Sequence, residues 1–256
     1  MEGHEPSSCD QRRLYADLAW TWPIISPPEH YIDEAQAFID TILRFSNIGV
    51  RTLLDLGCGG GHVDRTLKKH VEVTGVDTSE AMLLLARRLN PEVTYCLGDM
   101  RTVRLGRTFD AVIAADSIDY MLDEEDLYAA FVTAFEHLEP GGVFCTYAEI
   151  TRENWQQNAV ACSVGAQGRT EIAFIENRYD PDPTDSTYES TFLYLIRQGG
   201  QLTIETDRHL GGIFALDTWR RLLQRAGFVI EETELPGEHI PMFACLRPSA
   251  ELKPGD

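Results

Sequence analysis

A glycine-rich stretch from Thr52 to His62, TLLDLGCGGGH, restricts the fold of this 256-residue chain more than any other feature. A short apolar run and the acid Asp55 come before Gly57, Gly59 and two further glycines, and a stretch with helical patterning follows. Glycine accepts a positive φ and has no side chain, so the backbone can approach a ligand closely there. The stretch predicts a buried strand, a tight turn that binds a cofactor, and a helix that begins at the turn.

Short apolar runs alternate with amphipathic segments from residue 30 to residue 147. The pattern predicts strands over 51–56, 71–76, 93–97, 109–115 and 143–147, and helices over 30–45, 62–69, 79–89 and 123–138. Such alternation indicates right-handed βαβ units, which form a parallel sheet with helices on both faces. The fold class is therefore α/β.

The pattern changes after residue 149. Polar and apolar residues alternate over 170–178, 187–197 and 201–209, which predicts a small antiparallel insert of three strands. A helix over 217–226 and a hairpin of strands over 228–235 and 240–246 follow. We divide the chain into an N-terminal segment (1–30), a cofactor-binding core (31–150), the insert (151–211), the C-terminal part of the core (212–247) and a tail (248–256).

The N-terminal segment is rich in aromatic residues. Tyr15, Trp20 and Trp22 come just before three prolines, which prevent a long helix. Aromatic side chains bury a large area wherever they pack. The segment could therefore be a lid that closes over the cofactor, with Tyr15 and Tyr31 facing the ligands, or a cap that covers apolar surface at the edge of the domain.

Two further acids follow the next predicted strands. Asp77 lies about 20 residues beyond the glycine turn, where an acid of a nucleotide-binding fold binds the ribose hydroxyls. Asp99 follows the third strand and reaches the same edge of the sheet, where it could accept a hydrogen bond from the amine of an adenine. A solvated turn is the alternative role for Asp99 taken alone.

Five segments in this order carry a resemblance: DLGCGGG, GVDTS, GDM, FDAVIAADSIDYM and LEPGG. The chain from about residue 30 to 247 resembles the class I S-adenosylmethionine-dependent methyltransferases. The segments GDMRTVRLGRTFDAV and AFEHLEPGGVF and the insert are most similar to the amino-sugar N,N-dimethyltransferases of deoxysugar biosynthesis. The resemblance implies a Rossmann-like seven-stranded sheet with a reversed last strand, plus a small antiparallel β insert.

The resemblance also implies S-adenosylmethionine as the cofactor and a set of residues that bind it. The turn backbone would face the methionine part, Asp77 the ribose, and Asp99 with the Met100 amide the adenine, against which Met82 would pack. Ala115 to Ser117 would lie near the sulfonium. The cofactor residues are Asp55, Gly57, Cys58, Gly59, Asp77, Thr78, Met82, Asp99, Met100 and Ala115.

Methyl transfer from an activated sulfonium depends mainly on aligning the nucleophile. We expect N-methylation of a small amine, with Asp119 and Tyr120 as catalytic candidates that orient the amine or take its proton. The acceptor-binding candidates are Tyr15, Tyr31, Glu149, Arg152 and His209. Purely structural roles for Tyr120, at the edge of the core, and for His209, as a surface or satisfied histidine, stay open.

The chain departs from the family pattern at one place. Members that act on sugar nucleotides carry an arginine just before the last strand, where this chain has PGEH over residues 236–239. This difference disfavours a nucleotide-sugar acceptor. Arg152, Arg178 and Arg208 would have to replace that arginine, if the insert folds over the site.

Three other functions are alternatives to N-methylation. They are O-methylation of a small metabolite, an NAD-dependent oxidoreductase, and a non-enzymatic module that binds S-adenosylmethionine. A dinucleotide site favours G-x-G-x-x-G and no reversed hairpin, so NAD fits less well. A net charge of -19 disfavours nucleic acid as a partner, and a homodimer is left open.

Composition and patterning bear on metals and location. The six cysteines are scattered without CxxC or Cys/His clusters, so we expect reduced thiols and no metal. No charged start followed by an apolar run opens the chain, and no apolar run approaches about 18 residues. We therefore expect a cytoplasmic protein that does not associate with membranes.

Overall fold

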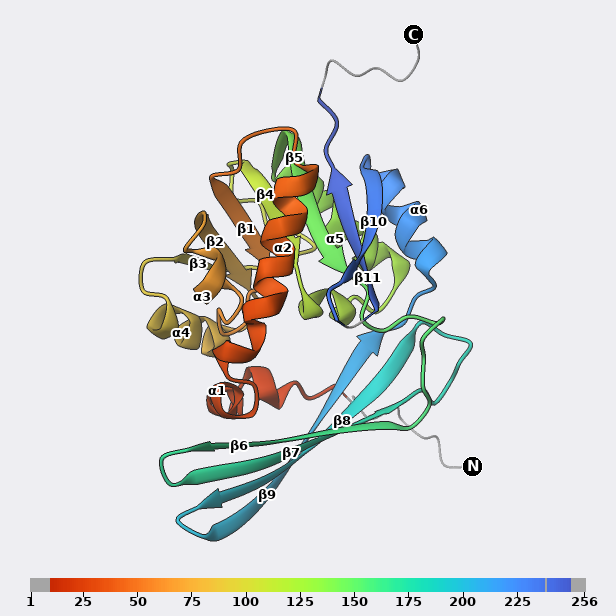
Figure 1. Ribbon diagram of the computed structural model, residues 1–256. Helices are drawn as coiled ribbons and strands as arrows, with labels where there is room; N and C mark the ends of the chain where they lie inside the picture. The colour runs from red at the N-terminus through yellow and green to blue at the C-terminus, as the bar shows by residue number, and fades with distance from the viewer. Residues whose placement is uncertain (1–9, 238, 250–256) are drawn as a thin grey trace.

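The fold is seen in a computed structural model that describes residues 10–237 and 239–249 (Figure 1). The first nine residues of the predicted N-terminal segment, Glu238 of the last hairpin connection, and most of the predicted tail lie outside the described residues. Within the described ranges the chain forms a seven-stranded sheet with helices on both faces, and a separate four-stranded sheet.

The seven-stranded sheet has the predicted parallel arrangement with one reversed strand. Its spatial order is β10-β11-β5-β4-β1-β2-β3, and β11 is antiparallel to both of its neighbours. The strands are β1 (Thr52–Leu56), β2 (Glu72–Asp77), β3 (Thr94–Leu97), β4 (Phe109–Ala114), β5 (Leu138–Tyr147), β10 (Val229–Leu235) and β11 (Ile240–Leu246). The reversed last strand expected from the resemblance is confirmed.

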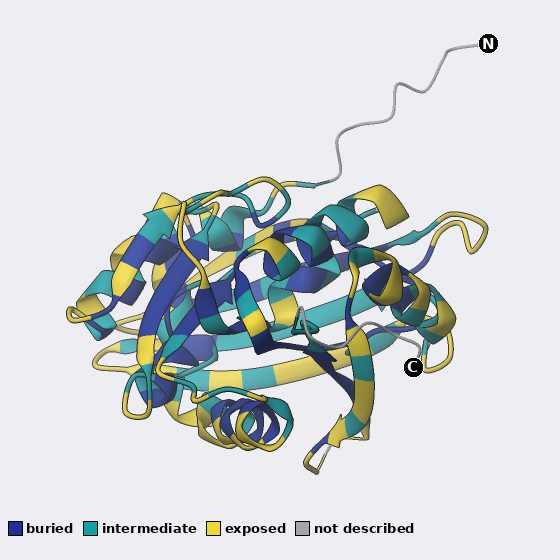
Figure 2. Cartoon of the chain, turned by 90° about the horizontal axis from the view of Figure 1, so that it is seen from above, coloured by how far each residue is buried: buried dark blue, intermediate teal, exposed yellow. Residues whose placement is uncertain are grey.

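Helices cover the two faces of this sheet. One face packs against α2 (Ile32–Phe45), α3 (Asp64–Leu67) and α4 (Glu80–Leu89), and the other against α5 (Glu124–Glu136) and α6 (Leu216–Ala226). The helices turn buried residues toward the sheet and exposed residues outward, as the banding in Figure 2 shows. Apolar burial on both faces is what fixes this three-layer arrangement.

The helix ends fix where the loops at the sheet edge leave the core. Ser79 caps α4, since its hydroxyl accepts a hydrogen bond from the Met82 amide at 3.1 Å. Asp123 caps α5 by accepting from the Asp126 amide at 2.8 Å. The α3 helix is much shorter than the 62–69 predicted, because the turn continues through residue 63 before regular helix begins.

The insert is a four-stranded antiparallel sheet and not the three-stranded one predicted. Its strands run in chain order: β6 (Ala159–Gln167), β7 (Thr170–Tyr179), β8 (Thr187–Gln198) and β9 (Gln201–Gly212). The prediction missed β6, whose inward side chains are small. A Cβ at Gly165 would lie 1.9 Å from the carbonyl oxygen of Ile24, so only glycine permits this close approach.

The N-terminal segment lies between the core and the insert (Figure 1). It forms the short helices η1 (Arg13–Tyr15), η2 (Ala19–Thr21), α1 (Trp22–Ile25) and η3 (Pro28–Tyr31). Four of its residues pack with the inner face of the insert sheet in one buried cluster: Leu14, Leu18, Ile24 and Ile25. The segment therefore covers apolar surface, and its aromatic residues are held close to the sheet edge. Among the described helices, none is long and apolar enough to span a membrane.

Candidate active site

A cavity of about 490 Å³ lies where β1, β2, β3 and β4 reach their carboxyl ends. All ten residues expected to bind the cofactor line it: Asp55, Gly57, Cys58, Gly59, Asp77, Thr78, Met82, Asp99, Met100 and Ala115. Residues of the N-terminal segment, including Tyr15 and Tyr31, form the opposite wall. Open α/β sheets bind ligands at this edge, so we name it the cofactor cavity.

The glycine turn forms the floor of the cofactor cavity and depends on positive φ angles. Gly57 has φ 84° and Gly59 has φ 51°, and the Gly57 amide donates to the Val76 carbonyl at 2.7 Å. At Gly59 the nearest atom to an added Cβ would be the terminal methyl of Met82 at 3.7 Å, so the floor stays open. These glycines permit a turn that side chains would strain or block.

Asp77 stands at the end of β2 and is tied to the turn. One carboxylate oxygen accepts from the Gly59 amide at 2.8 Å, and the other from the Ser79 amide at 2.7 Å. Burial raises the pKa of Asp77. Each carboxylate oxygen can accept a second hydrogen bond, so a diol in the cavity would find an acceptor already oriented.

Asp55 forms a buried acid pair beneath the turn. Burial and the nearby Asp64 raise the pKa of Asp55 well above its usual range, and burial raises that of Asp64 to about 6. The Tyr95 hydroxyl donates to Asp64 at 2.9 Å. Two close carboxyls out of water share a proton, so this pair lowers the negative charge that its two acids would otherwise place below the cavity.

Asp99 lies on the cavity wall with both oxygens already bound by one arginine. The Arg101 guanidinium donates from Nε to Oδ1 at 3.0 Å and from Nη2 to Oδ2 at 2.6 Å, and its Nη1 donates to Asp126 at 2.7 Å. These bonds hold the pKa of Asp99 below its usual range. An adenine amine would therefore share Asp99 with Arg101.

A second cavity, of about 360 Å³, lies between the sheet edge and the insert. Both cavities have in their walls Tyr15, Trp22, Asp116 and Tyr120. Asp119, Glu149 and His209, three of the expected acceptor and catalytic residues, line only the second cavity. We name it the acceptor cavity, because it meets the cofactor cavity at those four shared residues.

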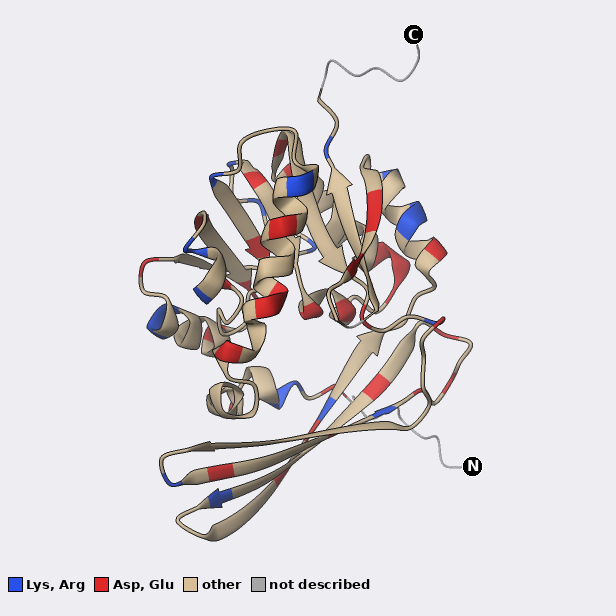
Figure 3. Ribbon diagram, in the orientation of Figure 1, with Lys and Arg blue, Asp and Glu red and all other residues tan. Residues whose placement is uncertain are grey.

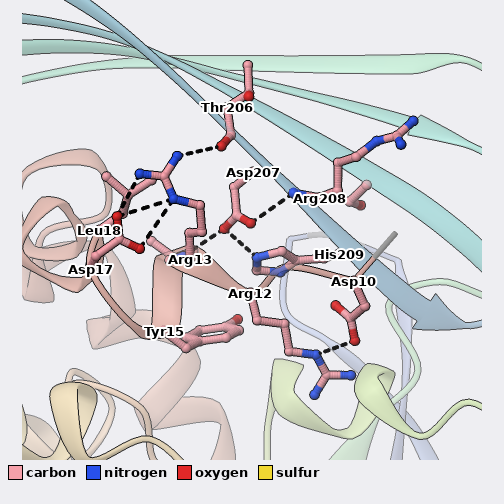
Figure 4. A network of polar contacts seen from close by, with 12 residues as sticks. Asp10, Arg12, Arg13, Tyr15, Asp17, Leu18, Thr206, Asp207, Arg208 and His209 are labelled. Carbon is pink, nitrogen blue, oxygen red and sulfur yellow. Dashed lines mark hydrogen bonds and ion pairs between the residues drawn. The ribbon is translucent and has the colours of Figure 1, made fainter. Parts of the chain in front are cut away.

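A line of hydrogen bonds leads from that shared wall into the insert. The Tyr15 and Tyr120 hydroxyl oxygens are 2.9 Å apart, and Tyr120 lies 2.6 Å from Nδ1 of His209. Nε2 of His209 lies 2.7 Å from the carboxylate of Asp207, in the network of Figure 4. His209 is thus a buried, satisfied histidine whose partners include both tyrosines at the shared wall.

The tautomer of His209 follows from the charge of Asp207. Although burial opposes ionisation, the hydrogen bond from His209 holds the pKa of Asp207 below its usual value. An ionised carboxylate only accepts, so Nε2 of His209 carries a proton and donates to Asp207; in the neutral ring, Nδ1 is then the acceptor for the Tyr120 hydroxyl. The oxygen of Tyr120 is then free to accept from Tyr15.

Acids are concentrated in the acceptor cavity. Burial, with repulsion from Asp116, raises the pKa of Glu149 to about 7. Burial, with repulsion from Glu149, also raises the pKa of Asp119 well above its usual range. Figure 3 shows acidic residues gathered where the seven-stranded sheet faces the insert. The cavity therefore favours a cation.

The remaining predicted residue lies elsewhere. Arg152 lines neither cavity, and its guanidinium donates to the carbonyls of Pro183 and Asp185. Sequence reasoning did not assign roles in the acceptor cavity to Glu176, Tyr188 and four further residues of the insert: Ser163, Phe174, Ser190 and Phe192. All are on strands β6, β7 and β8, and only the register between these strands brings them together.

Comparisons with known proteins agree with this geometry. A family model described as a methyltransferase domain matches residues 53–142. An enzyme of Streptomyces venezuelae, named dTDP-3-amino-3,4,6-trideoxy-alpha-D-glucopyranose N,N-dimethyltransferase, is 41% identical over 115 residues, which are 44% of this chain and 48% of that relative. A Streptomyces fradiae enzyme, named dTDP-3-amino-3,6-dideoxy-alpha-D-glucopyranose N,N-dimethyltransferase, is 28% identical over 76% of each chain.

Among solved structures, Streptomyces venezuelae DesVI is similar over almost the whole chain. The TM-score is 0.79 with 26% identity, and the match covers 93% of this chain and 99% of that one. A structure of CalS10 from Micromonospora echinaspora, solved with S-adenosylmethionine bound, has a TM-score of 0.77 with 24% identity, over 96% of this chain. With the turn, the acid Asp77 at the end of β2 and the reversed strand described above, these matches show that residues 53–142 form a methyltransferase domain within a fold similar to that of DesVI.

Proposed function

We propose that this enzyme transfers a methyl group from S-adenosylmethionine to the nitrogen of a small amine, an amino sugar. The observation that carries the proposal is the meeting of the cofactor cavity and the acidic acceptor cavity at Tyr15, Asp116 and Tyr120. A methyl group must pass from one bound molecule to another, so the two sites must touch. The relatives named as amino-sugar N,N-dimethyltransferases support the nitrogen acceptor.

The described residues fit the cofactor. The open glycine floor would leave room for the methionine part, while the oriented carboxylate of Asp77 would bind the ribose hydroxyls. Met82 would pack against the adenine, with Asp99 at its edge. When bound, S-adenosylmethionine supplies a methyl group that its sulfonium already activates. The protein's contribution is then mainly alignment.

The acceptor residues would orient the nitrogen and handle its proton. A nitrogen needs a free lone pair to react, so a bound ammonium must first lose a proton. Asp119 is an acid of the acceptor cavity, and burial raises its pKa, which makes its carboxylate a stronger base than an exposed one. Tyr120, held by His209 and Tyr15, would fix the position of the amine at the shared wall.

Binding and turnover measurements test the proposal. Calorimetry with S-adenosylhomocysteine and, separately, NADH should give tight binding only for the first. Incubation with S-adenosylmethionine and a panel of amino sugars should add one or two methyl groups by mass spectrometry, and fragmentation should locate them on nitrogen. Binding of S-adenosylhomocysteine without transfer to any amine would instead favour a binding module, and methyl groups on oxygen would favour O-methylation.

The proposal extends to assembly and location. We propose a homodimer formed through the outer face of the insert sheet. We also propose that the enzyme works in the cytoplasm, where thiols stay reduced. All five cysteines among the described residues are free, and two of them, Cys96 and Cys162, are not buried. Mass spectrometry under non-reducing conditions should find these thiols unlinked.

A further inference from the structure

The acceptor cavity has an unequal balance of charge. The ionisable side chains in its described wall, tyrosines aside, are Asp116, Asp119, Glu149, Glu176, Arg178, His30 and His209. Four carboxyl groups therefore face one guanidinium. The described wall of the neighbouring cofactor cavity is acidic as well, with six carboxyl groups and two guanidiniums, Arg12 and Arg101. Arg12 pairs with Asp10 and Arg101 with Asp99, so both are already bound by carboxylates.

The one guanidinium of the acceptor cavity is already bound by carboxylates. Arg178 donates from Nε to Glu176 at 2.8 Å and from Nη2 to the second oxygen of Glu176 at 3.3 Å. The same Nη2 donates to Glu149 at 3.2 Å. A paired arginine of this kind cannot form the bidentate contact that a phosphate needs without first losing its carboxylate partners.

The other two arginines that could bind the phosphates of a nucleotide sugar, Arg152 and Arg208, also have partners elsewhere. Arg152 binds backbone carbonyls of the β7–β8 connection, and Arg208 pairs with Glu189 at 3.6 Å. Neither lines either cavity. A diphosphate in the acceptor cavity would therefore add negative charge to a wall with a surplus of acids, and like charges at close range are unfavourable.

The walls of the acceptor cavity combine acids with aromatic rings. Trp22, Phe174, Tyr188 and Phe192 line it together with the acids. Aromatic faces provide apolar contact for the carbon-bound side of a ring, while the carboxylates provide acceptors for an ammonium and for hydroxyl groups. A ring with an amine and hydroxyl groups fits this combination.

We propose that the methyl acceptor is an amino sugar held through its ammonium by the acids of the acceptor cavity, and that it carries no phosphate. This inference rests on the proposed function and narrows it. The acceptor would then differ from those of the relatives, which are named for dTDP-linked sugars. The sugar would be a simple glycoside or part of a larger uncharged or cationic molecule.

Matched pairs of probes test the inference. Methyl glycosides of 3-amino-3,6-dideoxyglucose and 4-amino-4,6-dideoxyglucose would each be compared with the dTDP conjugate of the same sugar. Calorimetry would use the enzyme saturated with S-adenosylhomocysteine, and turnover would be read by mass spectrometry. At least one glycoside should bind about tenfold more tightly than its conjugate or better, and its kcat/KM should be higher by a similar factor.

Variants connect that preference to the acceptor cavity. Asp119→Asn should weaken glycoside binding by about tenfold, and Glu176→Gln, which frees one side of Arg178, should shift the preference toward the conjugate. Glu171→Gln, an exposed change on the same strand β7 as Glu176, should alter neither. Binding of S-adenosylhomocysteine by each variant shows that the fold is intact.

Two results would overturn the inference. One is a dTDP conjugate that binds as tightly as its glycoside, or more tightly, in both pairs. The other is unchanged glycoside binding in Asp119→Asn. Transfer to the conjugate would leave the proposed N-methyltransferase function intact, whereas the absence of transfer to every amine tested would count against the function itself.

Discussion

The carboxylate of Asp77 links the glycine turn to the cofactor cavity. It accepts from the amides of Gly59 and Ser79, and under the proposed function it would accept from a ribose diol. Asp77→Ala removes the ribose acceptor and loosens the turn, so the Kd for S-adenosylhomocysteine should rise at least about tenfold, or about 1.4 kcal/mol. Calorimetry measures this rise, and Glu80→Gln, on the adjacent turn of α4, is the control. An unchanged Kd for Asp77→Ala would remove Asp77 from the cofactor site.

Glu149 should make the affinity of the acceptor cavity for a cation depend on pH. Its pKa is raised to about 7, so the carboxylate is largely protonated at pH 6 and largely ionised at pH 8. Binding of a cation should therefore strengthen as pH rises through about 7. A trimethylammonium sugar is a suitable probe, because its own charge does not titrate. Its calorimetric affinity, with S-adenosylhomocysteine present, should rise over this range.

Glu149→Gln should flatten this rise. The groups that face Glu149 include Asp116, Glu176 and Arg178, and Asp119 is a further acid of the same cavity with a raised pKa. If the rise persists in Glu149→Gln, the titrating group is a different acid, and Asp119→Asn identifies it. A flat profile in the unmodified enzyme would contradict the assignment to any of them.

His62 should contribute to stability in a defined pH window. It is 4% exposed and stacks on Trp22 with ring centroids 5.8 Å apart. Burial lowers its pKa from 6.5 to about 4. Between these two pH values the unfolded chain binds a proton at His62 and the folded chain does not. Its contribution is therefore present above pH 6.5 and is lost as pH falls toward 4, by about 3 kcal/mol in all.

The variant His62→Phe keeps a stacked ring and removes the titration. Urea unfolding at pH 7.5 and at pH 4.5 measures the free energy of unfolding of both proteins. The decrease between these pH values should be smaller for His62→Phe, while the other titrating groups, common to both proteins, cancel in the comparison. Equal decreases would show that His62 is protonated in the folded protein.

Helices and strands could be predicted where apolar side chains recur at a regular interval along the chain. The strands of the core were predicted, and so were helices beginning at residues 79 and 123, where Ser79 and Asp123 act as caps, since buried strands and capping residues leave local signals. Strand β6 was missed, because its contact with α1 requires Gly165 and other small inward residues. The α6 helix begins at Leu216, one residue before the predicted start at residue 217.

The gathering of the ten candidate cofactor residues around one cavity could be predicted, because they follow successive strands and parallel strands bring their ends together. The acceptor cavity could be predicted only in part. Asp119, Glu149 and His209 were singled out from their places at strand ends, while Glu176 and Tyr188 were not. Their inclusion depends on how β7 and β8 pair and on where the insert lies against the core, which no local pattern specifies.

Asp207 joins two of these elements. Its side chain is fully buried and accepts from the Leu14 amide of η1 at 2.7 Å as well as from His209 on its own strand β9 (Figure 4). The Gln11 amide also donates to the Arg208 carbonyl at 2.7 Å. Asp207 therefore holds the segment that carries Tyr15 and also fixes the tautomer of His209.

The Asp207 carboxylate accepts three hydrogen bonds, from Leu14 and His209 on Oδ2 and from the Arg208 amide on Oδ1, and the amide in Asp207→Asn cannot accept at both positions. The free energy of unfolding should fall by about 1–3 kcal/mol, and hydrogen exchange should accelerate over residues 11–18. The kcat should fall more than the KM for S-adenosylmethionine rises, because Tyr15 and Tyr120 lie at the shared wall. Thr203→Ser, an exposed change on the same strand β9, should affect neither stability nor this exchange. Unchanged exchange over 11–18 would contradict this role.

At the scale of the whole molecule, the insert sheet has an apolar face with no covering element among the described residues. Its inner side chains, such as Ile172 and Tyr194, pack against the N-terminal segment. The residues that alternate with them face outward and line up across the four strands in the observed register: Val160, Cys162, Val164, Ala173, Ile175, Leu193, Leu195 and Ile204. Val164 is 82% exposed and Ile204 is 57% exposed.

A second copy of the chain is the partner that this face fits. A contiguous apolar strip on a surface marks an interaction site. The chain has a net charge of -19, so two copies repel one another wherever acids meet. The strip of eight outward residues contains no acid, so two copies can approach there with the least repulsion while apolar area is buried.

Val164→Asp tests the homodimer directly. The unmodified chain should sediment as a dimer of about 58 kDa, twice the 28.8 kDa of the chain. An acid at this exposed position on the edge strand β6 would face its own copy or apolar neighbours in a dimer. The dimer affinity should therefore fall at least about tenfold, and the 28.8 kDa species should dominate at micromolar concentration. Asp182→Asn, in the exposed β7–β8 connection, should leave the dimer intact. A monomeric unmodified chain, or an equally stable Val164→Asp dimer, would show that two copies do not meet through this face.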